Sequence, residues 1–221
     1  MRKRIYKNTI LAICIISLSL MFFIGSFASL FLSEKYYQEL YQKTGTYERI
    51  NKSVADNETK QLFNFFESQK SSLDQNFYTP NEISHLNDVK TLINNIFVVY
   101  YIALFLLLIS VIIVYRYFSE EYSFFISKVL FYSGFLTIFI VIIMAIFSIS
   151  SFSGTFEDFH RVFFNGNYMF PYSSNMIKMF SEEFFQLFAA RIFLISGVKG
   201  IVAITLSAIL IWKKKIRFFA E

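Results

Sequence analysis

Four long apolar runs limit what this chain can fold into. A membrane-spanning helix needs about 20 consecutive apolar residues, and four stretches meet this requirement, at about residues 10–32, 96–115, 129–152 and 192–212. Hydrophobic residues make up 55% of the 221 residues and charged residues only 17%, which excludes a disordered chain, a disulfide scaffold and a cytosolic enzyme. We therefore predict an all-α membrane protein, with residues 1–221 forming a single integral membrane domain of four transmembrane helices.

Basic residues are unevenly distributed between the two sides of this predicted bundle. The N-terminal segment, the loop between the second and third runs and the C-terminal tail together carry a net charge of +7, whereas residues 33–95 and 153–191 carry −3. Lys and Arg concentrate in short cytoplasmic segments, so we predict that both termini are cytoplasmic. The loops at about 33–95 and 153–191 are then extracytoplasmic. The net charge of +5 needs no nucleic-acid partner to explain it.

The first outer loop contains two helix signals. The apolar spacing over about 54–67 predicts a helix that lies against the membrane or the helix bundle. Thr79, Pro80 and Glu82 form a capping box, with Thr79 at the N-cap and Glu82 three residues later. No Gly or Pro follows before Tyr115, so we expect the helix that begins at Pro80 to continue into the second apolar run.

The second outer loop also predicts short amphipathic helices. Thr155 is a candidate N-cap with Asp158 three residues later, so we expect a helix from there to about Phe164 that stops at residues 165–166. Its aromatic residues cover more than one face, which suits packing on the bundle or at the membrane interface. A further amphipathic helix is expected over about 176–188 and leads into the fourth run.

The chain has two histidines, one in each outer loop. Histidine suits general acid–base work because its unperturbed pKa is about 6.5. His85 and Asp88 are three residues apart and share a helix face, where a carboxylate can orient an imidazole. One interpretation is a two-histidine site assembled from both loops, centred on His85 and His160. The other is a pair of interfacial histidines with only structural hydrogen bonds.

Other chemistries have weaker support in the sequence. The two histidines with Glu82 or Asp88 could hold zinc, but neither an HExxH nor an HxH pattern is present. There is no G-x-S-x-G elbow and no Gly-rich phosphate loop, and Cys14 lies in an apolar run without a nearby His. We therefore expect no metal and no cofactor.

Lys199 is a charge inside the fourth apolar run. A charge within a span is costly and often functional, and this one is about 10 Å from the predicted outer edge. It could contact a lipid head group, an acidic partner or a polar cavity, or its amine could snorkel to the interface. Arg161 and Arg191 are candidate phosphate contacts on the outer side.

Two segments resemble the signatures of a known family. Residues 82–90 read Glu-Ile-Ser-His-Leu-Asn-Asp-Val-Lys and resemble the Glu-x-x-His-Met-x-Asp-Val-Lys signature of a bacterial integral membrane family that includes the lipoprotein intramolecular transacylase. Residues 159–167 resemble its second signature, a Phe-His pair followed by Phe and an Asn/Asp-rich turn. The chain departs from the family pattern at Leu86, Tyr168 and Ser181, where Met, Trp and Pro are expected.

The resemblance implies an acyl shift within a lipoprotein in the bacterial cytoplasmic membrane. The sn-2 acyl chain of the diacylglyceryl group would move to the α-amine of the N-terminal Cys, without ATP and without a covalent acyl-enzyme. The substrate would be a diacylglyceryl-modified lipoprotein in the outer leaflet, surrounded by membrane lipids. The alternative is a non-enzymatic membrane protein whose outer loops bind a lipid or a protein. The predicted catalytic residues are His85 and His160, the supporting residues are Asp88, Glu82 and Lys90, and the lipid or substrate contacts are Arg161, Lys199, Arg191 and Tyr168.

Overall fold

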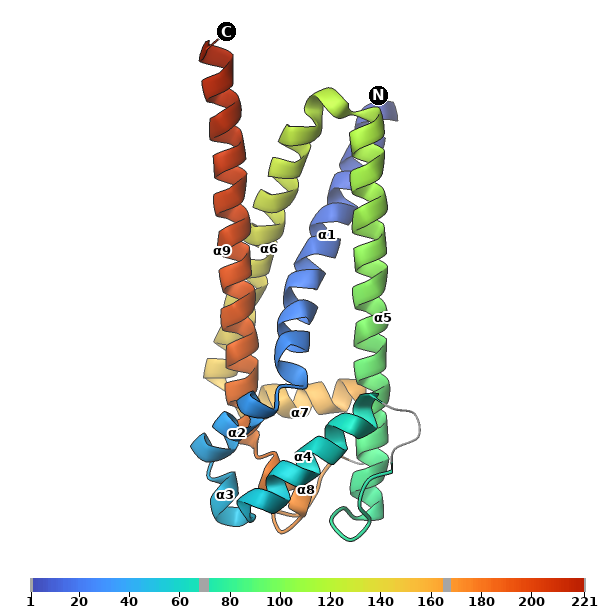
Figure 1. The fold of residues 1–221 in the computed structure, drawn as a ribbon, viewed down its shortest axis with the longest axis vertical. Helices are drawn as coiled ribbons and strands as arrows, with labels where there is room; N and C mark the ends of the chain where they lie inside the picture. The colour runs from blue at the N-terminus through green and yellow to red at the C-terminus, as the bar shows by residue number, and fades with distance from the viewer. Residues whose placement is uncertain (1, 68–71, 165–167, 221) are drawn as a thin grey trace. The chain divides into compact units, whose positions relative to one another are not determined.

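The computed structural model describes residues 2–67, 72–164 and 168–220, and every regular element in these ranges is helical. Four of the described helices, α1, α5, α6 and α9, are long and apolar enough to cross a membrane, which confirms the predicted class. In chain order the elements are α1 (Arg2–Phe31), α2 (Glu34–Lys43), α3 (Thr46–Arg49), α4 (Lys52–Glu67), α5 (Pro80–Tyr117), the short 3-10 helix η1 (Ser119–Glu121), α6 (Tyr122–Ser150), α7 (Phe152–Phe163), α8 (Asn175–Met179) and α9 (Glu182–Ala220) (Figure 1).

The two loops contain more helix than the sequence predicts. The helix expected over 54–67 is α4, and α5 begins at Pro80 as the capping box indicates. The expected start at Thr155 is wrong, because Ser151 is the N-cap of α7 and its side chain accepts a hydrogen bond from the Gly154 N–H. α2 and α3 were not predicted. Residues 165–166, the expected stop signal, lie outside the described residues.

The helix predicted over 176–188 is two helices. α8 ends at Met179 and α9 begins at Glu182, so the continuous prediction is wrong. The Ser181 side chain accepts a hydrogen bond from the Phe184 N–H at 3.4 Å, which is an N-cap contact and starts a new helix there. Phe180, between the two helices, is buried.

Contacts divide the chain into two compact parts, which we describe separately. The spanning part comprises residues 1–27, 96–145 and 192–221. Within it, α6 and α9 approach closely: Ser207 Oγ donates to the Ser127 carbonyl at 2.8 Å, and the two hydroxyls are 2.9 Å apart. Small residues that let helix backbones meet, with hydroxyls bonded across the contact, are a common way to pack helices in a membrane.

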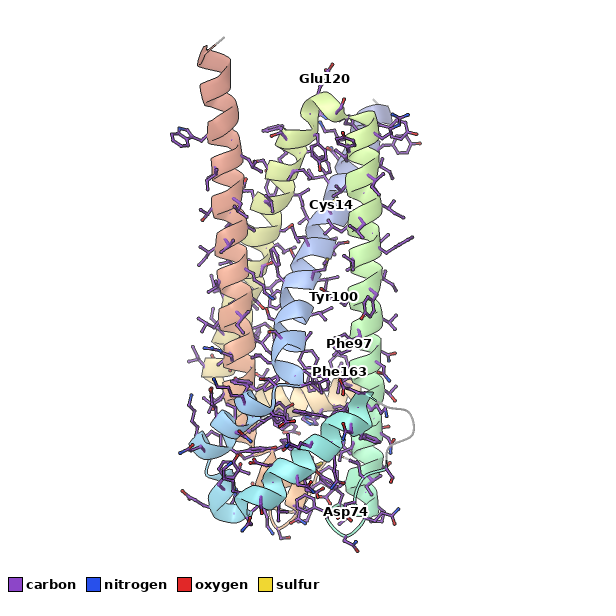
Figure 2. All side chains as sticks on the ribbon, viewed as in Figure 1. Cys14, Asp74, Phe97, Tyr100, Glu120 and Phe163 are labelled. Atoms are coloured by element: carbon purple, nitrogen blue, oxygen red, sulfur yellow. The ribbon has the colours of Figure 1, made fainter. Side chains whose placement is uncertain are left out.

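α1 joins the same part through similar contacts. Ser19 Oγ donates to the Ser133 carbonyl on α6 at 3.1 Å. Cys14, labelled in Figure 2, is fully buried in an apolar cluster with Val114, Phe125 and Val129. Its thiol therefore fills space in the helix bundle.

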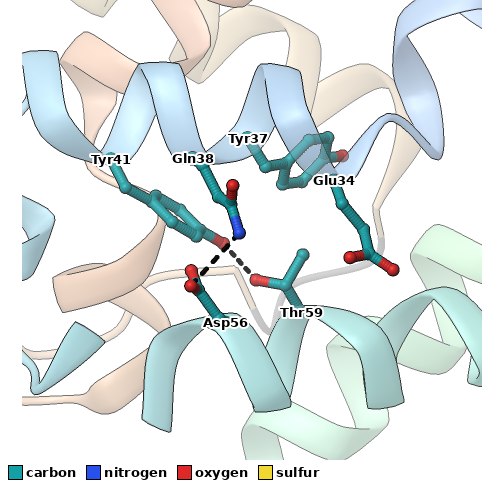
Figure 3. Close-up of a pocket in the computed structure, with 6 residues that line it drawn as sticks. All are labelled: Glu34, Tyr37, Gln38, Tyr41, Asp56 and Thr59. Carbon is teal, nitrogen blue, oxygen red and sulfur yellow. Dashed lines mark hydrogen bonds between the residues drawn. The ribbon is translucent and has the colours of Figure 1, made fainter. Parts of the chain in front are cut away.

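The loop part comprises residues 28–95 and 146–191. Its core is aromatic: the ring of Tyr37 on α2 is 4.8 Å from that of Phe63 on α4 and 5.3 Å from that of Phe184 on α9. Figure 3 shows α2 facing α4, where Tyr41 and Thr59 share a hydrogen bond of 2.7 Å. These contacts give residues 28–95 and 146–191 a packed core of their own.

The α6–α9 contact predicts a large difference between two Gly→Ala substitutions. A Cβ added at Gly134 would lie 2.5 Å from the Gly200 carbonyl oxygen, whereas one added at Gly197 would meet nothing closer than Val141, at 4.0 Å. We expect Gly134→Ala to cost about 1–3 kcal/mol through overpacking. Gly197→Ala should leave stability unchanged or raise it slightly, because Ala is the better helix former. Thermal unfolding of both variants in detergent measures the difference, and equal melting temperatures would contradict this packing.

Candidate active site

The start of α5 is tied to the start of α8 by a buried carboxylate. Glu82 is 1% exposed, and its two oxygens accept hydrogen bonds from the Thr79 N–H at 2.7 Å and from the Met176 N–H at 3.1 Å. The Thr79 hydroxyl in turn accepts from the Glu82 N–H at 3.4 Å, which completes the capping box. Glu82 therefore caps its own helix and also satisfies a backbone donor from the second loop.

A second contact supports the same junction. The Asn175 side-chain amide donates to the Phe77 carbonyl at 2.8 Å. The Tyr78 hydroxyl, which is buried, reaches Met179 Sδ at 3.8 Å. Two segments about one hundred residues apart in the sequence are thus held together just before the helix that carries His85.

The structure brings His85 and His160 together. The two rings are stacked, with centroids 6.0 Å apart and an interplanar angle of 22°. Aromatic rings surround the pair: Phe164 and Phe170 lie 4.8 and 5.5 Å from His85. Phe156 on α7 lies 4.3 Å from His160. A pair of imidazoles at this spacing can serve one reacting group between them.

The tautomer of His160 follows from its hydrogen bond. Its Nδ1 lies 2.7 Å from the Phe156 carbonyl oxygen. A carbonyl oxygen only accepts, so Nδ1 carries the proton and, in the neutral ring, Nε2 keeps a free lone pair. Burial lowers the pKa of His160 below its ordinary value, and the bond to Phe156 opposes that shift in part. At neutral pH the ring is therefore uncharged and Nε2 can accept a proton.

His85 lies in a more enclosed position. The residue is 6% exposed, and its Nδ1 is buried without a hydrogen-bond partner among the residues that the structure describes. An unpaired buried polar atom is costly in an apolar setting and is common where a ligand completes the site. Two positive charges so close together would repel, so the pair carries at most one positive charge.

The other two predicted supporting residues on α5, Asp88 and Lys90, differ in their contacts. Asp88 is exposed, and within the described ranges no hydrogen bond joins it to His85. Lys90 donates to the Phe65 carbonyl on α4, and its amine lies 4.2 Å from the Phe65 ring centroid. Lys90 thus fastens α5 to α4.

Among the predicted contact residues in the loop part, Tyr168 contacts an imidazole. Its ring centroid is 5.4 Å from that of His160. Arg161 is exposed and pairs with Glu157 at 2.9 Å and with Asp158 at 3.3 Å on its own helix. Arg191 is exposed on α9. Its positive charge partly opposes the rise in the pKa of Tyr36 that burial causes.

Lys199 belongs to the spanning part. Its amine donates to Ser26 Oγ on α1 at 3.1 Å, and it would lie 3.6 Å from a Cβ built at Gly25. Tyr100, labelled in Figure 2, would contact the same Cβ. The ammonium group thus lies between α9 and α1 with a hydroxyl as acceptor.

The aromatic enclosure was not predicted as part of the site. Phe164 and Phe170 contact His85, whereas the sequence pattern predicted only that the rings of the second loop pack on the bundle or at the membrane interface. Phe164 is in fact buried, whereas Phe159 and Phe163 are exposed. Among the described residues, no group of three His, Cys, Asp or Glu side chains could hold a metal ion.

The fold and the site define a multi-pass helical membrane protein with a stacked pair of imidazoles in an aromatic enclosure. A sequence model of the lipoprotein intramolecular transacylase Lit matches residues 7–185. The chain therefore belongs to the lipoprotein intramolecular transacylase family, as its two signatures indicate, and the family is one of acyltransferases that act within lipoproteins.

Solved structures of similar fold come from Bacillus cereus. The membrane integral lipoprotein intramolecular transacylase Lit of that organism superimposes with a TM-score of 0.82 at 20% identity, over 96% of this chain and 98% of that one. Its H85R variant gives 0.78 at 20% identity, over 98% of this chain and 99% of that one. Its H85A variant gives 0.79 at 19% identity, over 97% of both chains. No curated protein sequence matches the chain.

The lowered pKa of His160 predicts how stability depends on pH. As the pH falls below about 6.5, an unfolded His160 binds a proton more readily than the folded one, so acid destabilises the fold until the lower folded pKa is reached. Because the chain has only two histidines, the imidazole resonances of ¹⁵N-histidine-labelled protein are directly assignable with a His85→Gln variant. We expect the His160 midpoint below 6.5 and a Nδ1–H tautomer at neutral pH. A midpoint above 6.5 would contradict this burial.

Proposed function

We propose that this chain moves the sn-2 acyl chain of a diacylglyceryl-modified lipoprotein to the α-amine of the N-terminal Cys, giving a lyso-form lipoprotein. The observation that carries the proposal is the stacked pair of imidazoles, 6.0 Å apart, that joins the two outer loops. Membership of the transacylase family supports the reaction class. The pairing of the two histidines supports their assignment as catalytic residues.

The proposed reaction needs one proton to be taken up and one to be delivered. The neutral α-amine attacks the ester carbonyl and forms a C–N bond. The C–O bond to the glycerol then breaks, leaving an amide and an sn-2 hydroxyl. The nitrogen loses one proton and the glycerol oxygen gains one, so atoms and charge balance without any second substrate. General acid–base groups placed at both atoms accelerate such a step by about 10²–10⁴-fold.

The two imidazoles take separate parts in this proposal. His160 acts as the base, because its Nδ1–H is held by the Phe156 carbonyl and its Nε2 is free to accept the amine proton. His85 polarises the ester carbonyl or delivers a proton to the glycerol oxygen, since its buried Nδ1 has no partner within the described ranges. Asp88, one turn from His85 and exposed, favours a transient positive charge on the pair.

No covalent acyl-enzyme is needed in this scheme. The amine and the ester belong to one molecule, so tethering supplies the proximity that a nucleophilic side chain would otherwise provide. Conversion of an ester to an amide is downhill, so the reaction requires neither ATP nor a separate acyl donor.

The substrate is proposed to enter from the outer leaflet. The exposed rings of Phe159 and Phe163 on α7 would meet its acyl chains. Tyr168, close to His160, would contact the reacting end of the substrate, while Arg161 and Arg191 would bind at the head-group level. Lys199 would contact lipid or substrate polar groups within the bundle.

This arrangement requires both termini on the cytoplasmic side of a bacterial membrane and the two histidines on the outer side. Single cysteines introduced at exposed positions in a Cys14→Ser background test the topology. We expect Lys43→Cys to react with a membrane-impermeant maleimide in intact cells, and Glu120→Cys to react only after permeabilisation. The reverse pattern would exclude an outer-face site.

The activity is tested in a bacterium that makes only diacylated lipoproteins. Tandem mass spectrometry of an N-terminal lipopeptide should place one acyl chain on the Cys nitrogen, with the intact mass unchanged because the shift is internal. His85→Gln and His160→Gln should each lower the yield of the shifted product by about 100-fold or more.

Asp158→Asn provides the matched control, because Asp158 is an exposed residue on the same helix as His160. We expect its yield to stay within about twofold of the parent chain, since exposed ion pairs contribute little. A free α-amine in the presence of correctly inserted parent protein would refute the transacylase assignment. Full activity of both histidine variants would refute only the proposed residues.

A further inference from the structure

A cavity of about 250 Å³ in the spanning part lies between the first turns of α1 and α6. Three basic side chains line it: Arg4 and Lys7 from α1, and Lys128 from α6. The acidic group nearest to them is Glu121, just before α6, which pairs with Lys7 and remains largely exposed. The basic groups outnumber the acidic one, so the cavity favours an anion.

The same cavity has an apolar floor. Leu11 on α1 and Phe125 on α6 line it, and Phe125 is only 1% exposed because it belongs to the Cys14 cluster. Lys128 places its amine 4.4 Å from the ring centroid of Phe124, which is also part of the lining. A ligand that fits this surface therefore carries an anionic group next to an uncharged, partly apolar portion.

The helix geometry explains why these groups converge. Arg4, Lys7 and Leu11 follow the spacing of one helical face, so α1 presents its cations and its apolar side chain in a single row. The lining residues of α6, Phe124, Phe125 and Lys128, come from its first two turns.

We propose that this cavity binds the phosphate group of an anionic glycerophospholipid. Its volume is close to the lower end of the range for small-molecule pockets, which suits a head group whose acyl chains remain in the membrane. Basic pockets between spanning helices on the cytoplasmic side are suited to such head groups. The asymmetry of Lys and Arg across the membrane explains the side on which these cations occur, but it does not require a cavity with an apolar floor.

The site is independent of the acyl-transfer chemistry. Arg4, Lys7 and Lys128 belong to the spanning part, and the two histidines belong to the loop part. Under the proposed topology the bound lipid is in the inner leaflet. Its role would be to anchor the start of α1 to α6 and to keep the helices together in a membrane rich in anionic lipid.

Native mass spectrometry of the full chain in detergent tests the proposal with phosphatidylglycerol and phosphatidylcholine as probes. We expect phosphatidylglycerol to be retained preferentially. Arg4→Gln or Lys128→Gln should weaken its binding by about fivefold each. Arg116→Gln removes an equal charge from an exposed residue outside the cavity lining, and its effect should stay below about twofold.

A second variant tests the space in the cavity without changing its charge. Asn8 lines the cavity and is exposed, so Asn8→Phe should block the head group while leaving every charge in place. Loss of phosphatidylglycerol binding in this variant, with an unchanged melting temperature without lipid, supports the site. Lys128→Gln and Asn8→Phe act through different properties, so failure of one to fold leaves the other as the test.

Three results would overturn the proposal. One is equal retention of the two lipids by the parent chain. Another is an equal effect of Lys128→Gln and Arg116→Gln, which would indicate general surface charge. The last is Lys128-dependent binding of inorganic phosphate without any preference for phosphatidylglycerol, which would assign the cavity to a free anion.

Discussion

The hydrocarbon core of the membrane imposes the constraint on which this structure depends. No water is present there to satisfy backbone N–H and C=O groups, so each spanning segment must close its hydrogen bonds within a helix. Polar side chains in the spanning part accordingly bond across helix contacts, as Ser127 and Ser207 do. Reactive polar groups therefore cost the least free energy when they lie outside the spans, and both histidines occur in the loop part.

The loop part is organised by one buried carboxylate. Glu82 accepts hydrogen bonds from the N–H of Thr79, the N-cap residue of α5, and from the N–H of Met176 at the start of α8. Because these partners are backbone N–H groups, both carboxylate oxygens have hydrogen-bond donors in a buried position without a cation. His85 follows Glu82 on α5 by one turn, so the same contact that starts the helix also sets where the imidazole lies relative to the second loop.

The environment of the two imidazoles suits proton transfer between neutral groups. Aromatic rings and burial disfavour a fixed charge, while the Phe156 carbonyl selects one tautomer of His160. In the proposed reaction, the neutral imidazole accepts a proton from the amine and passes it on without leaving a stable ion pair. The exposed ring of Phe159 on α7 lies 5.6 Å from that of His160, so an exposed aromatic surface adjoins the imidazoles.

The sequence by itself determined the class of the protein, the four spanning helices and the start of α5, because apolar runs and capping boxes are local signals. It also placed one histidine in each outer loop, from which we predicted a shared site, and the structure stacks the two rings. Only the tertiary structure decided that α8 and α9 are separate, that Lys90 fastens α5 to α4, and that Phe164 and Phe170 enclose His85. These features depend on contacts between segments far apart in the chain, and a local pattern carries no information about such contacts.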